Sequence, residues 1–301
     1  MLQQRILLIA PDGQVGWELL RCSQSLGQVF VAGRKYHGTN QTYIDLSDAD
    51  SIRKVISEVK PNIILNAAAY TAVDKAEQEE ELALKINGIA PGILAEEAKK
   101  LDALLVHYST DYVFDGTGEM PYKEDDPVNP VSAYGRTKLA GEQNIQASNC
   151  KHFIFRTSWV YGTRGKNFLL TVQRLAKERD ELRIVADQMG APTWCRMIAG
   201  TTVNVLAQLR SPLCKADINE LSGIYHMTNG GQTNWYEFAK AIVAEEEKQP
   251  MVYPITTAEY QTPAKRPAYS VLSNEKLINT FDIRLPDWDK TLQLCMHSRY
   301  V

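Results

Sequence analysis

Hydrophobic residues in the first half of the chain form two alternating kinds of segment. Short, nearly continuous apolar runs are typical of strands buried on both faces of a sheet. Between them apolar residues recur at helical spacing, most clearly at Ile52, Val55, Ile56 and Val59. The apolar runs lie at 5–10, 29–33, 62–71, 104–110 and 152–160. This alternation predicts an α/β fold with a doubly wound parallel sheet of the Rossmann type.

The pattern loosens after about residue 165. Helical spacing is still readable at 167–179, 197–209 and 235–247, but the intervening segments contain more proline and glycine. We therefore predict a dinucleotide-binding domain over 1–165 and a smaller C-terminal lobe over 166–301. This lobe would mainly bind substrate, and part of it would return to the sheet.

One predicted helix, over 85–101, contains Pro91. Proline lacks an N–H and clashes with the preceding turn, so this helix should be kinked at Pro91 or begin near it.

The composition is that of an ordinary soluble globular protein, with 44% of the 301 residues hydrophobic and 23% charged. A net charge of -3 and a pI near 6.0 argue against binding to nucleic acid or to an anionic membrane surface. The five cysteines have neither metal-ligand nor disulfide spacing. Because the N-terminal apolar run is too short for a signal or membrane helix, we expect a cytoplasmic protein.

A glycine-containing turn follows the first predicted strand. Gly13, Gln14 and Val15 stand where a dinucleotide-binding loop places a pyrophosphate on the amides at a helix start. Ala10 occupies the place of the first glycine in the usual pattern. A cofactor loop and a plain strand-to-helix turn therefore both fit this segment.

Later strand ends carry residues suited to the same cofactor. The second strand ends at Arg34 and Lys35, and basic residues here suit a ribose 2'-phosphate, which favours NADPH with NADH as the alternative. Asp45 and Leu46 follow a strand end at which they could line the adenine. The alanines at 67–69 leave room for a ligand across the sheet, although they also fit tight core packing.

The candidate chemistry centres on one helix and the strand before it. Ser132 can cap a helix whose first turn carries Tyr134, and a spacing of four places Lys138 on the same face. A cation beside a phenol favours the phenolate and lowers its pKa towards the working range of an acid/base catalyst. Thr110 and Asp111 stand at the carboxyl end of the 104–110 strand, near this helix.

Six segments carry a resemblance to a known family. Their order and spacing resemble the extended short-chain dehydrogenase/reductase superfamily and, within it, the family of dTDP-4-dehydrorhamnose reductases. The resemblance covers nearly the whole chain. The matching segments are Gly13–Glu18, Asn66–Glu77, His107–Phe114, Tyr134–Glu142, Phe155–Tyr161 and Asp187–Thr193.

The resemblance implies reduction of the C4 keto group of dTDP-4-dehydro-L-rhamnose to dTDP-L-rhamnose by NADPH or NADH. Tyr134 would protonate the C4 oxygen, Lys138 would bind the nicotinamide ribose, and Thr110 would hydrogen-bond the same oxygen. The residues implied to hold the cofactor, besides Tyr134 and Lys138, are Gly13, Gln14, Val15, Arg34, Asp45, Leu46, Ala69, Tyr70 and Thr71.

The same resemblance implies contacts with the sugar nucleotide. Asp111 and Trp159 would touch it, together with Thr110. Arg266, beside Pro267, is the candidate for the dTDP diphosphate because a guanidinium fork suits phosphate; a surface salt bridge is the other interpretation of Arg266.

Some members of this family are dimers linked by magnesium through carboxylates. Glu18 matches one of those carboxylates, but Arg196 and the region of His297 stand where we align the others. No metal site is therefore predicted, and a dimer built through magnesium is not expected. A homodimer of another kind stays open.

Two other kinds of function share the fold. One is a nucleotide-sugar dehydratase, epimerase or reductase acting on another 4-keto sugar; a dehydratase typically has a glutamate where this chain has Tyr112 after Thr110 and Asp111. The other is a non-catalytic NADP-binding regulatory subunit, like the beta subunit of methionine adenosyltransferase. The complete set of Thr110, Tyr134 and Lys138 argues against such a loss of activity.

Overall fold

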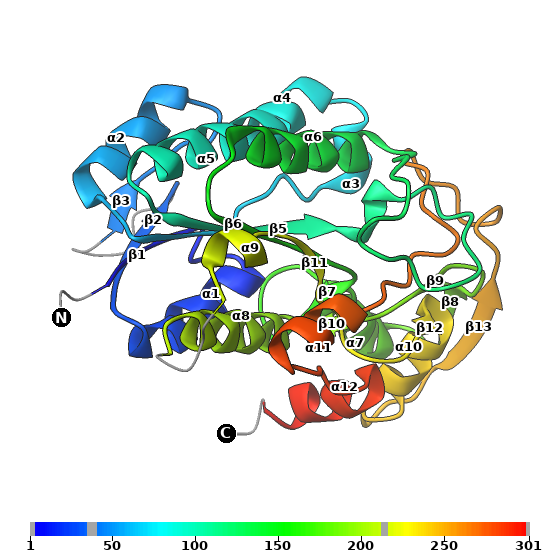
Figure 1. Cartoon of the computed structure of the whole chain (residues 1–301). Helices are drawn as coiled ribbons and strands as arrows, with labels where there is room; N and C mark the ends of the chain where they lie inside the picture. Colours follow the sequence, from blue (N-terminus) through cyan, green and yellow to red (C-terminus); the bar gives the residue numbers. More distant parts are fainter. Residues whose placement is uncertain (1–3, 35–40, 212–215, 299–301) are drawn as a thin grey trace.

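The computed structural model describes residues 4–34, 41–211 and 216–298, and a parallel sheet forms its centre (Figure 1). Every neighbouring pair of strands in this sheet is parallel, which confirms the predicted doubly wound fold. In sheet order the strands are β11 (Gly223–His226), β6 (His152–Thr157), β5 (Leu104–Thr110), β4 (Ile63–Asn66), β1 (Arg5–Ile9), β2 (Gln28–Gly33) and β3 (Gln41–Tyr43). The strand order reverses between β1 and β4, where folds of this kind bind their ligands at the carboxyl ends.

Helices cover both faces of the sheet, as the apolar strands require. One face packs on α2 (Ala49–Val59), α5 (Ala90–Lys100) and α6 (Ala133–Ser148), and the other on α1 (Gln14–Cys22), α8 (Cys195–Leu209) and α11 (Glu275–Phe281) (Figure 1). The predicted apolar stripe of α2 is buried on all four of its residues. Although α8 and β11 follow residue 165 in the chain, they lie against α1 and β6 in the layers of the sheet.

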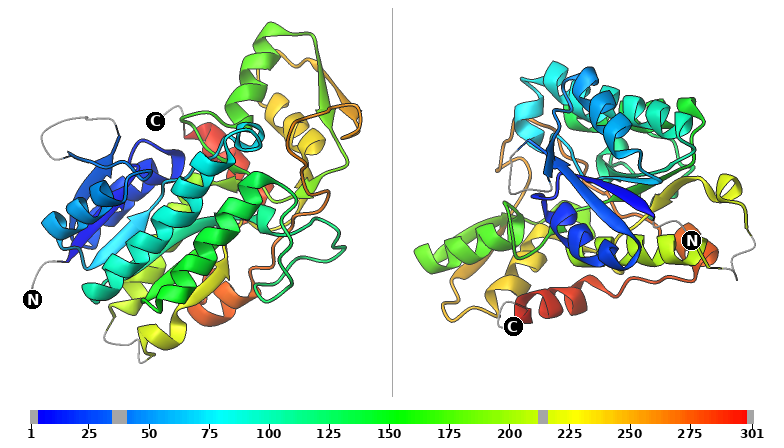
Figure 2. Two further views of the ribbon diagram at one scale, coloured as in Figure 1. Left: turned by 90° about the horizontal axis from the view of Figure 1, so that it is seen from above. Right: turned by 90° about the vertical axis from the view of Figure 1, so that its left-hand side faces the viewer.

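The remaining C-terminal elements form a second core beyond one end of the sheet (Figure 2). A parallel strand pair, β8 (Glu181–Val185) and β13 (Met251–Ile255), lies beside α10 (Trp235–Val243), and β8 also contacts α7 (Phe168–Glu178). Helix α12 (Trp288–His297) packs into the same core. The short elements are η1 (Ser23–Ser25), α3 (Val73–Ala76), η3 (Asp111–Val113), β7 (Val160–Tyr161), β9 (Met189–Gly190), β10 (Thr193–Trp194), α9 (Ile218–Leu221) and β12 (Thr233–Asn234). Within the described ranges no helix has the length and apolarity that crossing a membrane requires.

The Pro91 segment is accommodated by a wider turn. Helix α4 (Glu80–Leu84) passes into a π-helix, η2 (Lys85–Ile89), which leads directly into α5 with Pro91 in its first turn. Pro91 cannot donate to the carbonyl of Asn87 four residues earlier. That carbonyl instead faces α6, where a Cβ on Gly141 would overlap it. The glycine therefore lets this long helix pack closely against the helix that carries Tyr134.

Candidate active site

The start of α6 lies directly against the end of β5. The Ser132 hydroxyl accepts a hydrogen bond from the Gly135 amide at 3.2 Å, as the predicted helix cap requires. A Cβ on Gly135 would overlap the carbonyl oxygen of Tyr112, so glycine permits this close approach. The packing brings Tyr134, in the first turn of α6, to the hydroxyl of Thr110, the last residue of β5.

The pKa of Tyr134 is raised, so we expect its phenol to keep its proton at neutral pH. Burial raises its pKa to about 12, the hydrogen bond with the Thr110 hydroxyl lowers it, and the nearby Asp111 carboxylate raises it. The sequence led us to expect the opposite shift, through Lys138. A phenol that keeps its proton at neutral pH can act as a proton donor but not as a base.

Lys138 is held beneath the site rather than at the phenol. Its side chain is only 1% exposed. The Nζ atom donates to the Tyr108 carbonyl oxygen at 2.6 Å and lies 3.1 Å from Nε2 of His107. Burial lowers the pKa of Lys138 to about 8, against the opposing effect of Glu142 one turn later. The Lys138 amine is therefore directed at β5, and burial remains the main cause of the high pKa of Tyr134.

Asp111 completes a hydrogen-bonded series with the two hydroxyls. The Thr110 hydroxyl donates to its Oδ1 atom at 3.0 Å and accepts from the Tyr112 amide at 3.2 Å. Burial raises the pKa of Asp111 to about 7, although hydrogen bonds from Ser270 and Thr110 lower it. An acidic group with a pKa this close to neutrality, beside Thr110 and Tyr134, is typical of a functional site.

The glycine turn after β1 has the shape that a phosphate needs. Ala10 adopts a left-handed φ of 62°, a conformation that glycine takes more easily, and a Cβ on Gly16 would overlap the Ala10 carbonyl oxygen. Gly13 begins α1 and no side chain caps the first amides. Gln14 accepts a hydrogen bond from Asn167 at 2.8 Å, and Val15 packs into the core. The open amides at this helix start can therefore receive an anion.

The remaining predicted cofactor residues lie along the same edge of the sheet. Arg34 is exposed just after β2, whereas Lys35 lies outside the described residues. Asp45 accepts hydrogen bonds from the Ser47 amide and hydroxyl, which lower its pKa, and Arg34 lowers it further. Leu46 is buried. An exposed guanidinium at this strand end suits a ribose phosphate.

The residues after β4 are fixed by the π-helix. The Asn87 side chain accepts from the Tyr70 amide at 2.8 Å and donates to the Tyr70 carbonyl at 3.1 Å. Ala69 is half-buried beside this pair, and Thr71 is exposed. The backbone of this segment therefore holds its position without any ligand.

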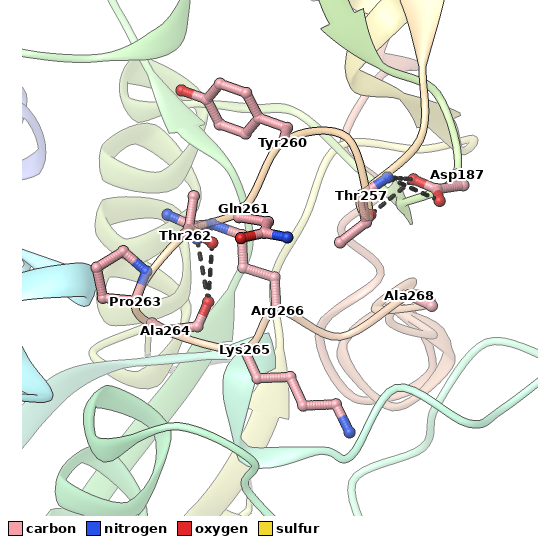
Figure 3. Close-up of a pocket in the computed structure, with 10 residues that line it drawn as sticks. All are labelled: Asp187, Thr257, Tyr260, Gln261, Thr262, Pro263, Ala264, Lys265, Arg266 and Ala268. Atoms are coloured by element: carbon pink, nitrogen blue, oxygen red, sulfur yellow. Dashed lines mark hydrogen bonds between the residues drawn. The ribbon is translucent and has the colours of Figure 1, made fainter.

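Trp159 and Arg266 occupy the second lobe. Trp159 has a left-handed φ of 45°, and its ring stacks on Trp235 with centroids 3.5 Å apart. Arg266 forms an ion pair of 2.9 Å with Asp74, the second residue of α3. This contact is the salt bridge that was the other interpretation of Arg266. Arg266 also lines a cavity of about 540 Å³ together with Asp187, Tyr260 and Lys265 (Figure 3). The Arg266 guanidinium turns towards Thr262, whereas the Lys265 side chain points the other way (Figure 3). Arg266 is thus the cation of this lining that can offer a guanidinium fork to an anionic group.

Glu18 pairs with a cation. Its carboxylate, 5% exposed, lies 3.3 Å from the Arg196 guanidinium. His297 ends α12 and contacts the Gln293 carbonyl. Across the described parts of the chain, no three His, Cys, Asp or Glu side chains gather in a way that could hold a metal ion.

The structure thus brings Thr110, Asp111 and Tyr134 together, whereas Lys138 joins them only through β5. The sequence interpretation overlooked His107 and Asn66, whose side chains contact each other at 3.0 Å beneath Lys138. Both residues begin segments that carried the family resemblance. Asn66 ends β4 and pairs in register with His107 in the middle of β5, so the strand-end position of Asn66 was the signal that could have revealed this pair.

Comparisons with known proteins agree with this geometry. The family model described as the RmlD substrate binding domain matches residues 4–301. A dTDP-4-dehydrorhamnose reductase of Burkholderia thailandensis is 47% identical over 302 residues, covering 98% of each chain. The crystal structure of a dTDP-4-dehydrorhamnose reductase from Clostridium acetobutylicum has a TM-score of 0.87 at 38% identity, covering 98% of this chain and 99% of that one.

A second solved structure carries a cofactor. It is the dTDP-4-dehydrorhamnose reductase of Bacillus anthracis in complex with NADP, with a TM-score of 0.86 at 34% identity, covering 99% of this chain and 100% of that one. The full-length match to the family model and the identity to curated relatives are sufficient to assign the family. The chain belongs to the dTDP-4-dehydrorhamnose reductase family, within the Rossmann-type extended short-chain dehydrogenases/reductases.

Proposed function

We propose that this protein reduces the C4 keto group of dTDP-4-dehydro-L-rhamnose and releases dTDP-L-rhamnose. NADPH is the preferred hydride donor and NADH the alternative. The observation that carries the proposal is the placement of the Tyr134 phenol beside the Thr110 hydroxyl, at the carboxyl edge of the sheet of a family member. The product would serve polysaccharide biosynthesis in the cytoplasm.

The residues at the edge of the sheet fit a dinucleotide. The uncapped amides of α1 receive the pyrophosphate, and Gly16 allows the turn to approach it closely. Arg34 binds the 2'-phosphate that distinguishes NADPH from NADH. When bound, the reduced nicotinamide supplies the hydride for C4. The Tyr70 segment, fixed by Asn87, forms the floor under it.

The protein's own chemistry is proton delivery to the C4 oxygen. The Thr110 hydroxyl orients this oxygen, and Tyr134 donates its proton as negative charge develops there. The pKa of about 12 keeps the donor protonated across the physiological range. Lys138 binds the nicotinamide ribose and stabilises the phenolate that remains after proton transfer.

The sugar nucleotide lies between the two lobes in this proposal. Asp111 and Trp159 contact the sugar, and Arg266, which lines the 540 Å³ cavity, receives the diphosphate. Arg266 then exchanges Asp74 for phosphate, because both are anions suited to a guanidinium fork. Neither magnesium nor a particular oligomer takes part in these steps.

The test supplies dTDP-4-dehydro-L-rhamnose with NADPH and with NADH in separate reactions. We expect loss of reduced-nicotinamide absorbance with both, a lower KM for NADPH, and dTDP-L-rhamnose as the product identified by NMR. One equivalent of tightly held NAD+ in protein purified without nucleotide would favour an epimerase. No turnover with any 4-keto nucleotide sugar, together with stable capture of a partner enzyme, would favour a regulatory subunit.

A further inference from the structure

A buried polar series runs beneath Tyr134 from α6 across two strands of the sheet. It contains Lys138 on α6, His107 on β5 and Asn66 on β4, and each of the three residues is only 1% exposed. Lys138 Nζ lies 3.1 Å from His107 Nε2, and His107 Nδ1 lies 3.0 Å from Asn66 Nδ2. Buried side chains of this kind are costly unless all their hydrogen bonds are satisfied, so their proton positions matter.

The orientation of the Asn66 amide fixes the tautomer of His107. The Ala68 backbone amide donates to Asn66 Oδ1 at 3.2 Å, which directs the Asn66 Nδ2 group towards the imidazole. Because Nδ2 is only a donor, Nδ1 of His107 must accept. A neutral imidazole then carries its proton on Nε2, the atom that faces Lys138. Burial and the Lys138 charge lower the pKa of His107 well below its ordinary value, which keeps the ring neutral.

This tautomer conflicts with a charged Lys138. An ammonium group has three donors and no acceptor, whereas the Nε2 proton of His107 needs an acceptor. A neutral amine can accept that proton and still donate to the Tyr108 carbonyl oxygen at 2.6 Å. The ammonium form requires the imidazole proton to move to Nδ1 and the Asn66 amide to turn, which breaks its bond with Ala68.

The other charged groups around Lys138 do not reproduce this effect. Glu142, one turn later on α6, favours the ammonium, but its carboxylate is paired with Arg156 of β6 at 2.7 Å. Tyr134, one turn earlier, is a neutral phenol, and Asp111 lies beyond it after β5 and favours positive charge. Of these neighbours, His107 is the one whose facing proton opposes an ammonium.

We propose that His107, oriented by Asn66, is a positioning residue that governs whether Lys138 carries a positive charge, and thereby the pH range in which the cofactor ribose is bound. The proposal rests on the assignment of Lys138 to the cofactor in the proposed function. It does not depend on which sugar is reduced. Burial lowers the pKa of Lys138, and donation from the His107 imidazole to the amine favours the neutral form further.

The test measures the dissociation constant of NADPH against pH by nucleotide fluorescence, without any sugar. For the parent protein we expect affinity to weaken as the pH rises through about 8, where Lys138 loses its proton. Lys138→Met should bind NADPH more weakly and should lose this weakening of affinity at alkaline pH, the alkaline limb of the binding curve. His107→Gln, whose amide oxygen can accept from an ammonium, should move the limb upward by about one pH unit.

Asn66→Asp provides an independent variant. Its carboxylate accepts the proton of Nδ1, so Nε2 becomes an acceptor for the Lys138 ammonium and the limb again moves upward. His152→Gln is the matched control, because this histidine contacts the Cys150 carbonyl at the far end of β6 and should leave the limb unchanged. The proposal is overturned if NADPH affinity weakens at the same pH in His107→Gln, in Asn66→Asp and in the parent protein, provided that both variants keep the parental thermal stability.

The result also separates this inference from the proposed function. If the alkaline limb moves upward in the variants but no dTDP sugar is reduced by the parent protein, the role of His107 is supported and the proposed substrate is rejected. Reduction of the sugar with unchanged limbs would do the reverse.

Discussion

Asp111→Asn should stabilise the protein while impairing its activity. The substitution keeps the size of the side chain and an oxygen that can accept from Thr110, but it removes a carboxylate that is only 2% exposed. Burial of a charged group is costly, and functional sites often retain such a cost because the charge is needed there. The proposed contact of Asp111 with the sugar supplies that need.

The magnitude follows from the two pKa values of the carboxyl group. The pKa is 3.8 in an ordinary aspartate and about 7 in the folded protein. The native state therefore binds more protons than the unfolded state between these values, and stability falls as the pH rises through this window. At pH 8 the full cost is about 4 kcal/mol, and between pH 5 and pH 8 it changes by roughly 2.5 kcal/mol.

The assay is urea unfolding of the parent and of Asp111→Asn at pH 5 and pH 8. The advantage of the variant should be about 1.5 kcal/mol at pH 5 and about 4 kcal/mol at pH 8. Asn cannot show this change by itself because it does not titrate. Asp125→Asn, at an exposed turn residue, is the control and should show no such dependence. An advantage that is equal at the two pH values would refute the reasoning, because Asp111 would then ionise in the folded state as easily as in the unfolded chain.

Three further predictions concern the cofactor edge of the sheet. Gly16→Ala should destabilise the fold by about 1–3 kcal/mol and weaken NADPH binding, since the new Cβ overlaps the Ala10 carbonyl oxygen. Urea unfolding and nucleotide titration measure the two effects. Parental values in both would contradict the close approach of Gly16 to the Ala10 carbonyl. Ala10→Gly should raise the unfolding free energy by up to about 1 kcal/mol because it relieves a left-handed alanine, and a loss of stability would show that this φ costs nothing. Arg34→Ala should raise the KM for NADPH about tenfold and leave the KM for NADH unchanged, whereas equal effects on the two would remove Arg34 from the 2'-phosphate site.

Periodicity was enough to predict the strands and helices of the sheet because those elements are buried on one or two faces. The predicted apolar stripe of α2 is buried in the structure, and β5 has the predicted bounds. The strands β8 and β13 escaped prediction, since they form a two-stranded pair whose alternate residues are exposed and whose pattern is short. Pro91 was readable as an interruption, but the π-helix that absorbs it depends on the contact between Asn87 and Gly141.

The sequence predicted that Thr110 and Asp111 lie near the Tyr134 helix, but it missed His107 and Asn66 and the direction in which the pKa of Tyr134 shifts. The Tyr134 and Lys138 spacing places both residues on α6, yet the direction of the Lys138 amine is decided by Tyr108 and His107, which come from another element. Burial raises the pKa of Tyr134, where helical spacing alone predicted a fall. Arg266 gives a similar lesson, since its partner Asp74 is far away in the chain.

The most direct measurement of proton delivery is the turnover of Tyr134→Phe with NADPH and dTDP-4-dehydro-L-rhamnose, compared with its affinity for NADPH. Removal of a general acid should lower kcat on the order of 10²–10⁴-fold, while a phenyl ring of the same shape leaves cofactor binding close to that of the parent. Near-parental turnover by this variant would contradict the assignment of Tyr134 as the proton donor.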